Sequence, residues 1–425
     1  MMLCGINEVT PGSVLGTEVV DPRRADHILL RAGVALDAAM IGSLAQRGVV
    51  QLWIEDSLAP EVDGRVAEQL SSARLEAYVR LRDDLRSASA RTVSVASVQA
   101  YRQAVMNLIT QAISSAPYAG MTDALFQSGD LANHSVNVAY LSLLTALHAE
   151  SYVVAEQPRL PHREARDMTV VGLAGMLHDI GKASMKGDAT RLHEVHAPAA
   201  ELPEDYVSHC EGGRRALEAA RVPARVLYAV LNHHQRFDGN GWPDVSEMTG
   251  GRVTGRLAGR RIHVVSRIVS ACNVLENLLR DAEGARRPAV AALQAFASPR
   301  FDGWFDPMIR HAVLLRVPPF AVGTRVRLSD ARHGVVSSPS LRDPCRPTIR
   351  VARGAPGAND DGADSATESV DLAARPDLFI THALGEEVAK FLYAAPMPVI
   401  APDTLCSDDT TAAFVGGRSA GEAAA

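Results

Sequence analysis

The stretch MTVVGLAGMLHDIGKA, residues 168–183, decides the fold of its region. Its apolar residues recur with helical spacing and predict a buried helix that ends near Gly181. His178 and Asp179 then lie in the last turns of this helix, where a carboxylate is costly unless it is paired or bound to metal. An imidazole beside a carboxylate offers a nitrogen and an oxygen ligand to divalent ions. The alternative is that Asp179 only caps the helix or pairs with Lys182.

Other histidines in separate helical segments can join the same centre. A single histidine in an apolar helix more often packs in the core, so the hypothesis rests on their number. Adjacent residues on a helix point ~100° apart, and one member of such a pair can therefore face each of two metals. The alternative for the adjacent pair is a polar helix end at the solvent. The predicted ligands are His134, His178, Asp179, His209, His233 and His234.

The 425 residues suffice for two or three domains. Apolar spacing predicts a mainly α protein: an all-helical bundle core with a small N-terminal α/β module and a small C-terminal β appendage. The Gly, Ala, Asp and Ser composition of GAPGANDDGADSATES predicts a flexible loop. The expected divisions are an α/β module at 1–58, a helical linker at 59–119, a helical metal domain at 120–317, a β appendage at 318–406 with a flexible loop at 354–369, and a disordered tail at 407–425.

Composition excludes several classes of function. The formal net charge of −6 provides no general attraction to a nucleic acid polymer. The first residues lack the pattern of a signal peptide, and the most apolar stretch, Val138–Ala149, is far shorter than the ~20 residues that span a bilayer. Five scattered cysteines without a CxxC spacing favour reduced thiols. We therefore expect a cytoplasmic protein that does not bind membranes.

Together these motifs resemble the HD-GYP family over roughly residues 120–315. HDxGK alone would indicate only the wider HD phosphohydrolase superfamily, whereas the HHxRxDGxGxP loop indicates the HD-GYP branch. The matching motifs, in the family's order and approximate spacing, are HSVNVA at 134–139, HDIGK at 178–182, His209 followed by Gly213, HHQRFDGNGWP at 233–243 and RIVSACNVLENLL at 267–279.

This resemblance implies a phosphodiesterase that hydrolyses cyclic di-GMP to pGpG or GMP with a binuclear or trinuclear centre of iron or manganese, that is, two or three divalent ions. Asp179 and Lys182 would be catalytic, with Lys182 against the substrate phosphate. Since a helix-terminal charge contributes only ~0.3–1 kcal/mol to stability, replacing Lys182 should slow turnover more than it weakens folding. The alternative is that Lys182 is a solvated charge at a helix end. The remaining residues implied to bind substrate are Arg236, Asp238, Gly241, Trp242 and Pro243.

Asp130 lies one helical turn before His134, so both share a helix face. It matches the position from which some relatives supply a carboxylate to a third metal. An acid favoured by the helix dipole is the equal alternative.

Several positions depart from the family pattern. Asn273 stands where the family has a metal-binding aspartate, so a neutral oxygen replaces a charged ligand and metal affinity should fall. Trp242 replaces the tyrosine of the signature and loses its hydroxyl, and Gln235 replaces a glutamate. Arg280 and Arg286 are candidates for a second phosphate contact, or equally for a solvated helix face.

Two other functions stay open. Asn273 favours a degenerate domain that binds cyclic di-GMP or a protein partner without hydrolysis. An HD phosphohydrolase acting on another nucleotide would share only the metal centre, and the HHQRFDGNGWP loop argues against it. The sequence is also compatible with signalling protein partners and with a homodimer.

Overall fold

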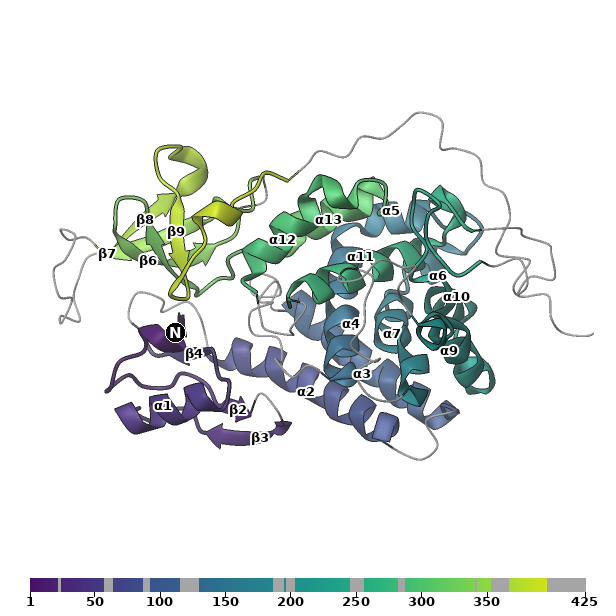
Figure 1. The fold of residues 1–425 in the computed structure, drawn as a ribbon, viewed down its shortest axis with the longest axis horizontal. Helices are drawn as coiled ribbons and strands as arrows, with labels where there is room; N and C mark the ends of the chain where they lie inside the picture. Colours follow the sequence, from purple (N-terminus) through teal and green to yellow (C-terminus); the bar gives the residue numbers. More distant parts are fainter. Residues whose placement is uncertain are drawn as a thin grey trace, which may run out of the picture.

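A helical domain fills one side of the molecule, and two small β-containing modules lie together on the other (Figure 1). This arrangement confirms the predicted mainly α class. Among the described residues, no helix combines the length and apolarity needed to cross a membrane. The computed structural model describes residues 1–21, 24–56, 64–86, 92–114, 130–185, 195, 203–244, 256–281, 287–340, 342–352 and 367–395.

Helices and short 3₁₀ segments (η) build the helical domain. The α-helices are α2 (Gly64–Arg86), α3 (Val95–Ser114), α4 (Leu131–His148), α5 (Glu150–Ala155), α6 (His162–Ala165), α7 (Thr169–Leu177), α8 (Glu204–Val207), α9 (His209–Leu217), α10 (Ala224–Asn232), α11 (Val264–Leu278), α12 (Ala289–Ala297) and α13 (Pro307–Arg316). The 3₁₀ segments are η3 (Ile180–Ser184), η6 (Glu218–Ala220), η7 (Gly259–Arg261) and η8 (Pro299–Phe301).

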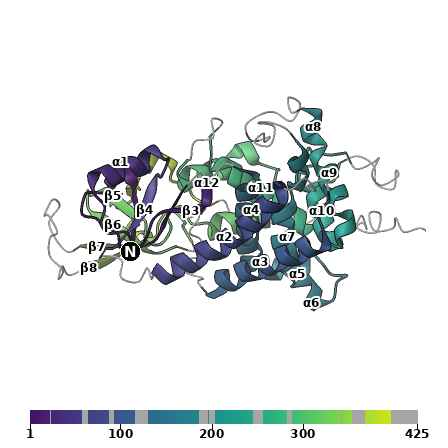
Figure 2. The same cartoon turned by 90° about the horizontal axis from the view of Figure 1, so that it is seen from below.

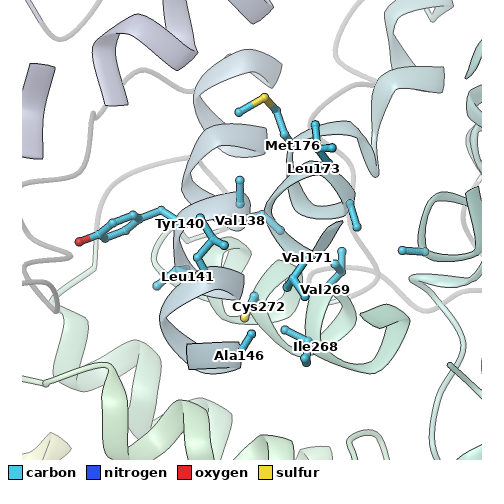
Figure 3. Close-up of a cluster of buried hydrophobic side chains, with 14 of the residues drawn as sticks. Val138, Tyr140, Leu141, Ala146, Val171, Leu173, Met176, Ile268, Val269 and Cys272 are labelled. Atoms are coloured by element: carbon cyan, nitrogen blue, oxygen red, sulfur yellow. The ribbon is translucent and has the colours of Figure 1, made fainter. Parts of the chain in front are cut away.

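The centre of this domain is the packing of α4, α7 and α11. Figure 3 shows Val138 and Leu141 of α4 beside Val171 of α7 and Val269 of α11, and all four are buried. The backbones of α4 and α7 approach closely at Gly175, where an added Cβ would lie 2.7 Å from the Cα of a residue in α4. A larger residue would separate the two helices. Close packing here sets the positions of the residues at the helix ends.

The predicted helical linker at 59–119 differs from what the structure shows. Its helices α2 and α3 bury Tyr78, Leu81, Tyr101 and Val105 in the same apolar cluster as α4, α7 and α11. Burial of the apolar faces of α2 and α3 against a core is lower in free energy than their exposure to water. These helices therefore belong to the helical domain.

The two β-containing modules have the following elements. The N-terminal module contains β1 (Met2–Gly5), η1 (Ile6–Glu8), β2 (Val19–Asp21), β3 (Arg24–Leu30), α1 (Ala38–Gln46) and β4 (Gln51–Ile54), with β1 antiparallel to β4 and β2 antiparallel to β3. The C-terminal module contains β5 (Arg325–Leu328), β6 (His333–Ser338), β7 (Thr348–Ala352), β8 (Thr367–Asp371), η9 (Leu372–Ala374), β9 (Ile380–Ala383), β10 (Glu386–Glu387) and η10 (Ala389–Phe391).

The C-terminal strands form an antiparallel sheet in the order β10-β9-β5-β6-β7-β8. Strand β8 begins at Thr367, so the predicted flexible loop at 354–369 is wrong for residues 367–369, which pair with β7. The rest of that loop, 354–366, and the predicted tail at 407–425 lie outside the described residues.

The two modules, separate in sequence, share one apolar core. Val335 of β6 is buried in the same cluster as Leu3 and Trp53 of the N-terminal module. The Leu3 amide donates to the Gly323 carbonyl at 2.8 Å, which continues the backbone pairing across both modules. Figures 1 and 2 show them side by side in both views. The C-terminal module thus packs against the N-terminal module.

A buried charge network ties the start of α11 to its neighbours. The Arg267 guanidinium forms ion pairs with Glu156, which follows α5, and with Asp306, the N-cap of α13. It also donates to the Tyr152 hydroxyl at 3.1 Å. The three charged side chains are at most 3% exposed. This network sets the position of α11 and hence of the residues that α11 presents to the centre of the domain.

Candidate metal centre

His178 and Asp179 lie just beyond the C-terminal end of α7. The helix ends at Leu177, earlier than predicted; His178 is its C-cap, and η3 begins after Asp179. Gly181 has a different role from the predicted cap. A Cβ at Gly181 would lie 2.0 Å from the carbonyl oxygen of His209, so η3 can touch α9 only with glycine there. This contact brings His209 next to Asp179.

Both oxygens of Asp179 face a pair of histidines. Oδ2 lies 3.5 Å from Nε2 of His134 and 3.4 Å from Nε2 of His178. Oδ1 lies 3.1 Å from Nε2 of His209 and 3.4 Å from Nε2 of His233. The Nε2 atoms are 3.2 Å apart in the first pair and 3.3 Å apart in the second. The carboxylate therefore stands between two sets of nitrogen ligands.

Hydrogen bonds on the far side of the rings determine the tautomers. Nδ1 of His178 lies 2.8 Å from the Gly175 carbonyl, and Nδ1 of His233 lies 2.9 Å from the Val230 carbonyl. Nδ1 of His209 contacts a carbonyl in the same way. A carbonyl only accepts, so Nδ1 of each ring carries a proton and Nε2 faces Asp179.

The pKa shifts agree with this assignment. Burial lowers the pKa of His233 to about 3 and also lowers that of His209, although Asp179 acts in the opposite direction. Both rings are therefore neutral near pH 7. Burial alone would raise the pKa of Asp179, but His178 and Lys182 hold it well below its usual range. The ionised carboxylate thus faces the Nε2 lone pairs of the neutral His209 and His233 rings.

This donor set fits divalent metal ions. Oδ1 of Asp179 is buried and accepts no hydrogen bond from the described residues. Two nitrogens bound to one tetrahedral ion at ~2.0–2.1 Å are about 3.3 Å apart, close to the spacing within each histidine pair. Within the described part of the chain, the possible ligand groups are His134, His178 and Asp179, and His209, Cys210, His233 and His234.

The sequence reasoning missed Glu276 and Asn137, which hold His134 in place. Nδ1 of His134 contacts Oε2 of Glu276, and the Asn137 amide donates to Oε1 of Glu276 at 3.1 Å. Burial acts to lower the pKa of His134, but Glu276 and Asp179 outweigh it and raise it to about 9. A carboxylate behind a ligand histidine fixes its orientation and raises its basicity. The available signal was a glutamate inside the apolar segment of α11.

Asp130 is not a member of either ligand group found among the described residues. Asp130 is the N-cap of α4, where it accepts from the Asn133 amide at 2.8 Å and from the Tyr78 hydroxyl at 2.9 Å. This geometry favours its role at the helix N-terminus. Asn273 is buried in α11, and its Oδ1 accepts from the Asn277 amide at 2.9 Å.

Lys182 is buried, which rules out the solvated helix end. Its Nζ donates to Oδ2 of Asp179 at 2.7 Å and lies 4.8 Å from the centre of the Tyr206 ring. The small effect on stability was expected for a solvated charge, and the burial of Lys182 removes that premise. Removing Lys182 would leave a buried carboxylate without its ion-pair partner, and breaking such a pair is strongly destabilising.

The glycine-rich loop after α10 packs over His209 and His234. The ring of Trp242, between Gly241 and Pro243, stacks on His234 with ring centres 3.8 Å apart. Gln235 connects two parts of this loop region, because its amide donates to the Pro243 carbonyl at 2.6 Å and its oxygen accepts from the Leu257 amide at 3.2 Å. A glutamate could not make the first bond.

The arginines predicted to bind substrate have other contacts. Arg236 forms an ion pair with Asp238 at 2.8 Å and stacks on Trp304 with its guanidinium carbon 3.9 Å from the ring centre. These contacts anchor the loop. Burial acts to raise the pKa of Glu276, but His134 and, to a smaller extent, Arg280 lower it. Arg280 therefore lies close to Glu276. Arg286 lies outside the described residues.

Comparison with known proteins identifies the domain that carries this site. The family model of the HD domain matches residues 134–309. The cyclic di-GMP phosphodiesterase PA4108 of Pseudomonas aeruginosa is 27% identical over 352 residues, covering 76% of this chain and 78% of the relative. The cyclic di-GMP phosphodiesterase response regulator RpfG of Xanthomonas campestris is 28% identical over 169 residues, covering 38% of this chain and 39% of the relative.

Among solved structures, Bd1817 of Bdellovibrio bacteriovorus, described as an HDG"Y"P protein, has a TM-score of 0.45 and 12% identity. It covers 73% of this chain and 97% of its own.

Proposed function

Because the chain belongs to the HD-GYP family of HD-domain proteins, we propose that it hydrolyses cyclic di-GMP to pGpG or GMP in the cytoplasm, with two or three iron or manganese ions. The observation that carries the proposal is the ligand geometry of Asp179. Each of its oxygens faces two imidazole nitrogens at 3.1–3.5 Å. The names of the relatives PA4108 and RpfG, both cyclic di-GMP phosphodiesterases, support the choice of substrate.

The residues that would hold the metal ions are His134, His178, Asp179, His209, His233 and His234. When bound, such ions act as Lewis acids on phosphate oxygens and lower the pKa of water. Lys182 would bind a non-bridging oxygen of the scissile phosphate, because an ammonium has three N–H donors and Asp179 takes only one. Glu276 would keep Nε2 of His134 turned towards Asp179. Trp242 would exclude water from the side of His234 that it covers.

The test is turnover of cyclic di-GMP by the full chain with manganese or ferrous iron, with products separated by chromatography. We expect linear pGpG or GMP, and no product after chelation of the metal. Metal bound at the histidines together with intact cyclic di-GMP would instead favour the degenerate binding domain, for which Asn273 is the supporting observation. Hydrolysis of a different nucleotide would point to another HD phosphohydrolase.

Replacing Lys182 by methionine should lower kcat by ~10²–10³, the usual effect of removing one donor to a charged transition state. The variant should also unfold more easily than the native protein, because Asp179 loses its buried partner. Metal content measured on the same sample separates the two effects. Native turnover at full metal content would show that Lys182 does not contact the phosphate.

Replacing Asn273 by aspartate should raise metal affinity and hydrolysis by ~10–100-fold, the range that a change in ligand support produces. Divalent ions bind an anionic oxygen more strongly than a neutral amide oxygen. The matched control is Asn107→Asp, which adds the same charge at a partly exposed asparagine of α3, outside the centre. Equal gains in both variants would attribute the effect to charge in general, and no gain in either would remove Asn273 from the centre.

A further inference from the structure

Cys210 is a member of the ligand group around His209, His233 and His234, although no motif of the sequence assigns it. One ligand atom from each of these four residues lies within 4.8 Å of every other. The sulfur is 3.6 Å from Nε2 of His209, the nitrogen that faces Asp179. All four side chains are buried, with Cys210 fully so.

The spacing fits a shared metal ion. A sulfur at ~2.3 Å and a nitrogen at ~2.0–2.1 Å from one tetrahedral ion are about 3.5 Å apart, close to the distance observed between Cys210 and His209. Nε2 of His209 and of His233 are 3.3 Å apart, which fits the same ion. Oδ1 of Asp179, buried and accepting no hydrogen bond from the described residues, approaches both histidines. The position of this oxygen is independent evidence for a cation between Asp179 and the two histidines.

We infer that Cys210 is a thiolate ligand of the metal bound by His209, His233 and His234. This inference rests on the proposed metal centre and adds a ligand to it. On binding, the thiol loses its proton to solvent, and the thiolate brings a negative charge that the neutral Asn273 does not supply. A thiolate with imidazoles favours zinc or iron(II), whereas carboxylates and water suit manganese. This position therefore takes a softer ion than an all-nitrogen-and-oxygen site would.

The competing explanation is that Cys210 only fills an apolar cluster with Tyr206, Leu231 and Trp242. A buried cysteine often behaves as a small apolar residue. Packing alone does not require the sulfur to lie beside the ligand nitrogen of His209. The same apolar neighbours would surround a metal-bound thiolate and limit its access to solvent.

Cobalt(II) added to the metal-free full chain provides the test, because a cobalt–thiolate bond gives a near-ultraviolet charge-transfer absorption that nitrogen and oxygen ligands do not. We expect this absorption in the native protein and in Cys345→Ser, a matched change at a buried cysteine of the C-terminal module. We expect its loss in Cys210→Ser, with zinc preference over manganese reduced by ~10-fold or more.

Cobalt bound by the native protein without this absorption would overturn the thiolate ligand and leave the histidine centre standing. Retention of the band in Cys210→Ser would overturn it as well. A native protein that binds no cobalt would contradict both the thiolate and the proposed metal centre. The spectrum of the native protein decides the question even if Cys210→Ser does not fold.

Discussion

Asp179→Asn is expected to remove bound metal and to slow hydrolysis by ~10³-fold or more. The carboxylate is the group that both histidine pairs face, at 3.1–3.5 Å. An amide of the same shape has one weak oxygen ligand, and its NH₂ group would point at the opposite pair. Metal ions provide several kcal/mol of transition-state stabilisation, and about 4 kcal/mol corresponds to ~10³ in rate. Metal analysis and turnover of cyclic di-GMP measure the two effects.

The matched control for this variant is Asp302→Asn, which makes the same chemical change at an exposed carboxylate. It should keep native metal content and turnover. Circular dichroism of Asp179→Asn should retain the helical signal, because the apolar packing of α4, α7 and α11 is unchanged. Full metal content in Asp179→Asn would show that Asp179 is not a metal ligand.

Arg267→Met should destabilise the protein by about 3–5 kcal/mol, the cost of breaking a buried ion pair by removing one partner. Methionine fills much of the same volume, so the loss comes from charge. Two buried carboxylates, Glu156 and Asp306, would lose the guanidinium between them. The free energy of unfolding from urea denaturation measures the change.

An exposed ion pair of the same type provides the comparison. Arg166→Met removes the cation of a pair with Glu150, in which the side chains are 53% and 37% exposed. Exposed pairs contribute only ~0.2–1 kcal/mol, so this variant should be close to native. If both variants unfold at the same urea concentration, the ion pairs of Arg267 contribute no more to stability than the packing of a methionine does. Metal affinity of Arg267→Met should also fall, because α11 carries Glu276 behind His134.

The predictions that agree with the structure concern local features. Apolar spacing identified the helices around His178 and His233, because the side-chain period of a helix is set by its own backbone. The C-cap of α7 was predicted at Gly181 but lies at His178, because Gly181 contacts α9 and forms no left-handed cap. That contact is between η3 and α9, and no local sequence pattern predicts that these two segments meet.

The sequence by itself therefore determined the mainly α class, the type of ligand and the helix ends that carry the histidines. Only the tertiary structure decided which groups meet. Glu276 reaches His134 across 142 positions of the chain, Lys182 is buried against Asp179 and Tyr206, and the sheet near the C-terminus covers the N-terminal module. Periodicity places a residue on a face of its own helix, but the partner of that face depends on how distant helices and strands pack together.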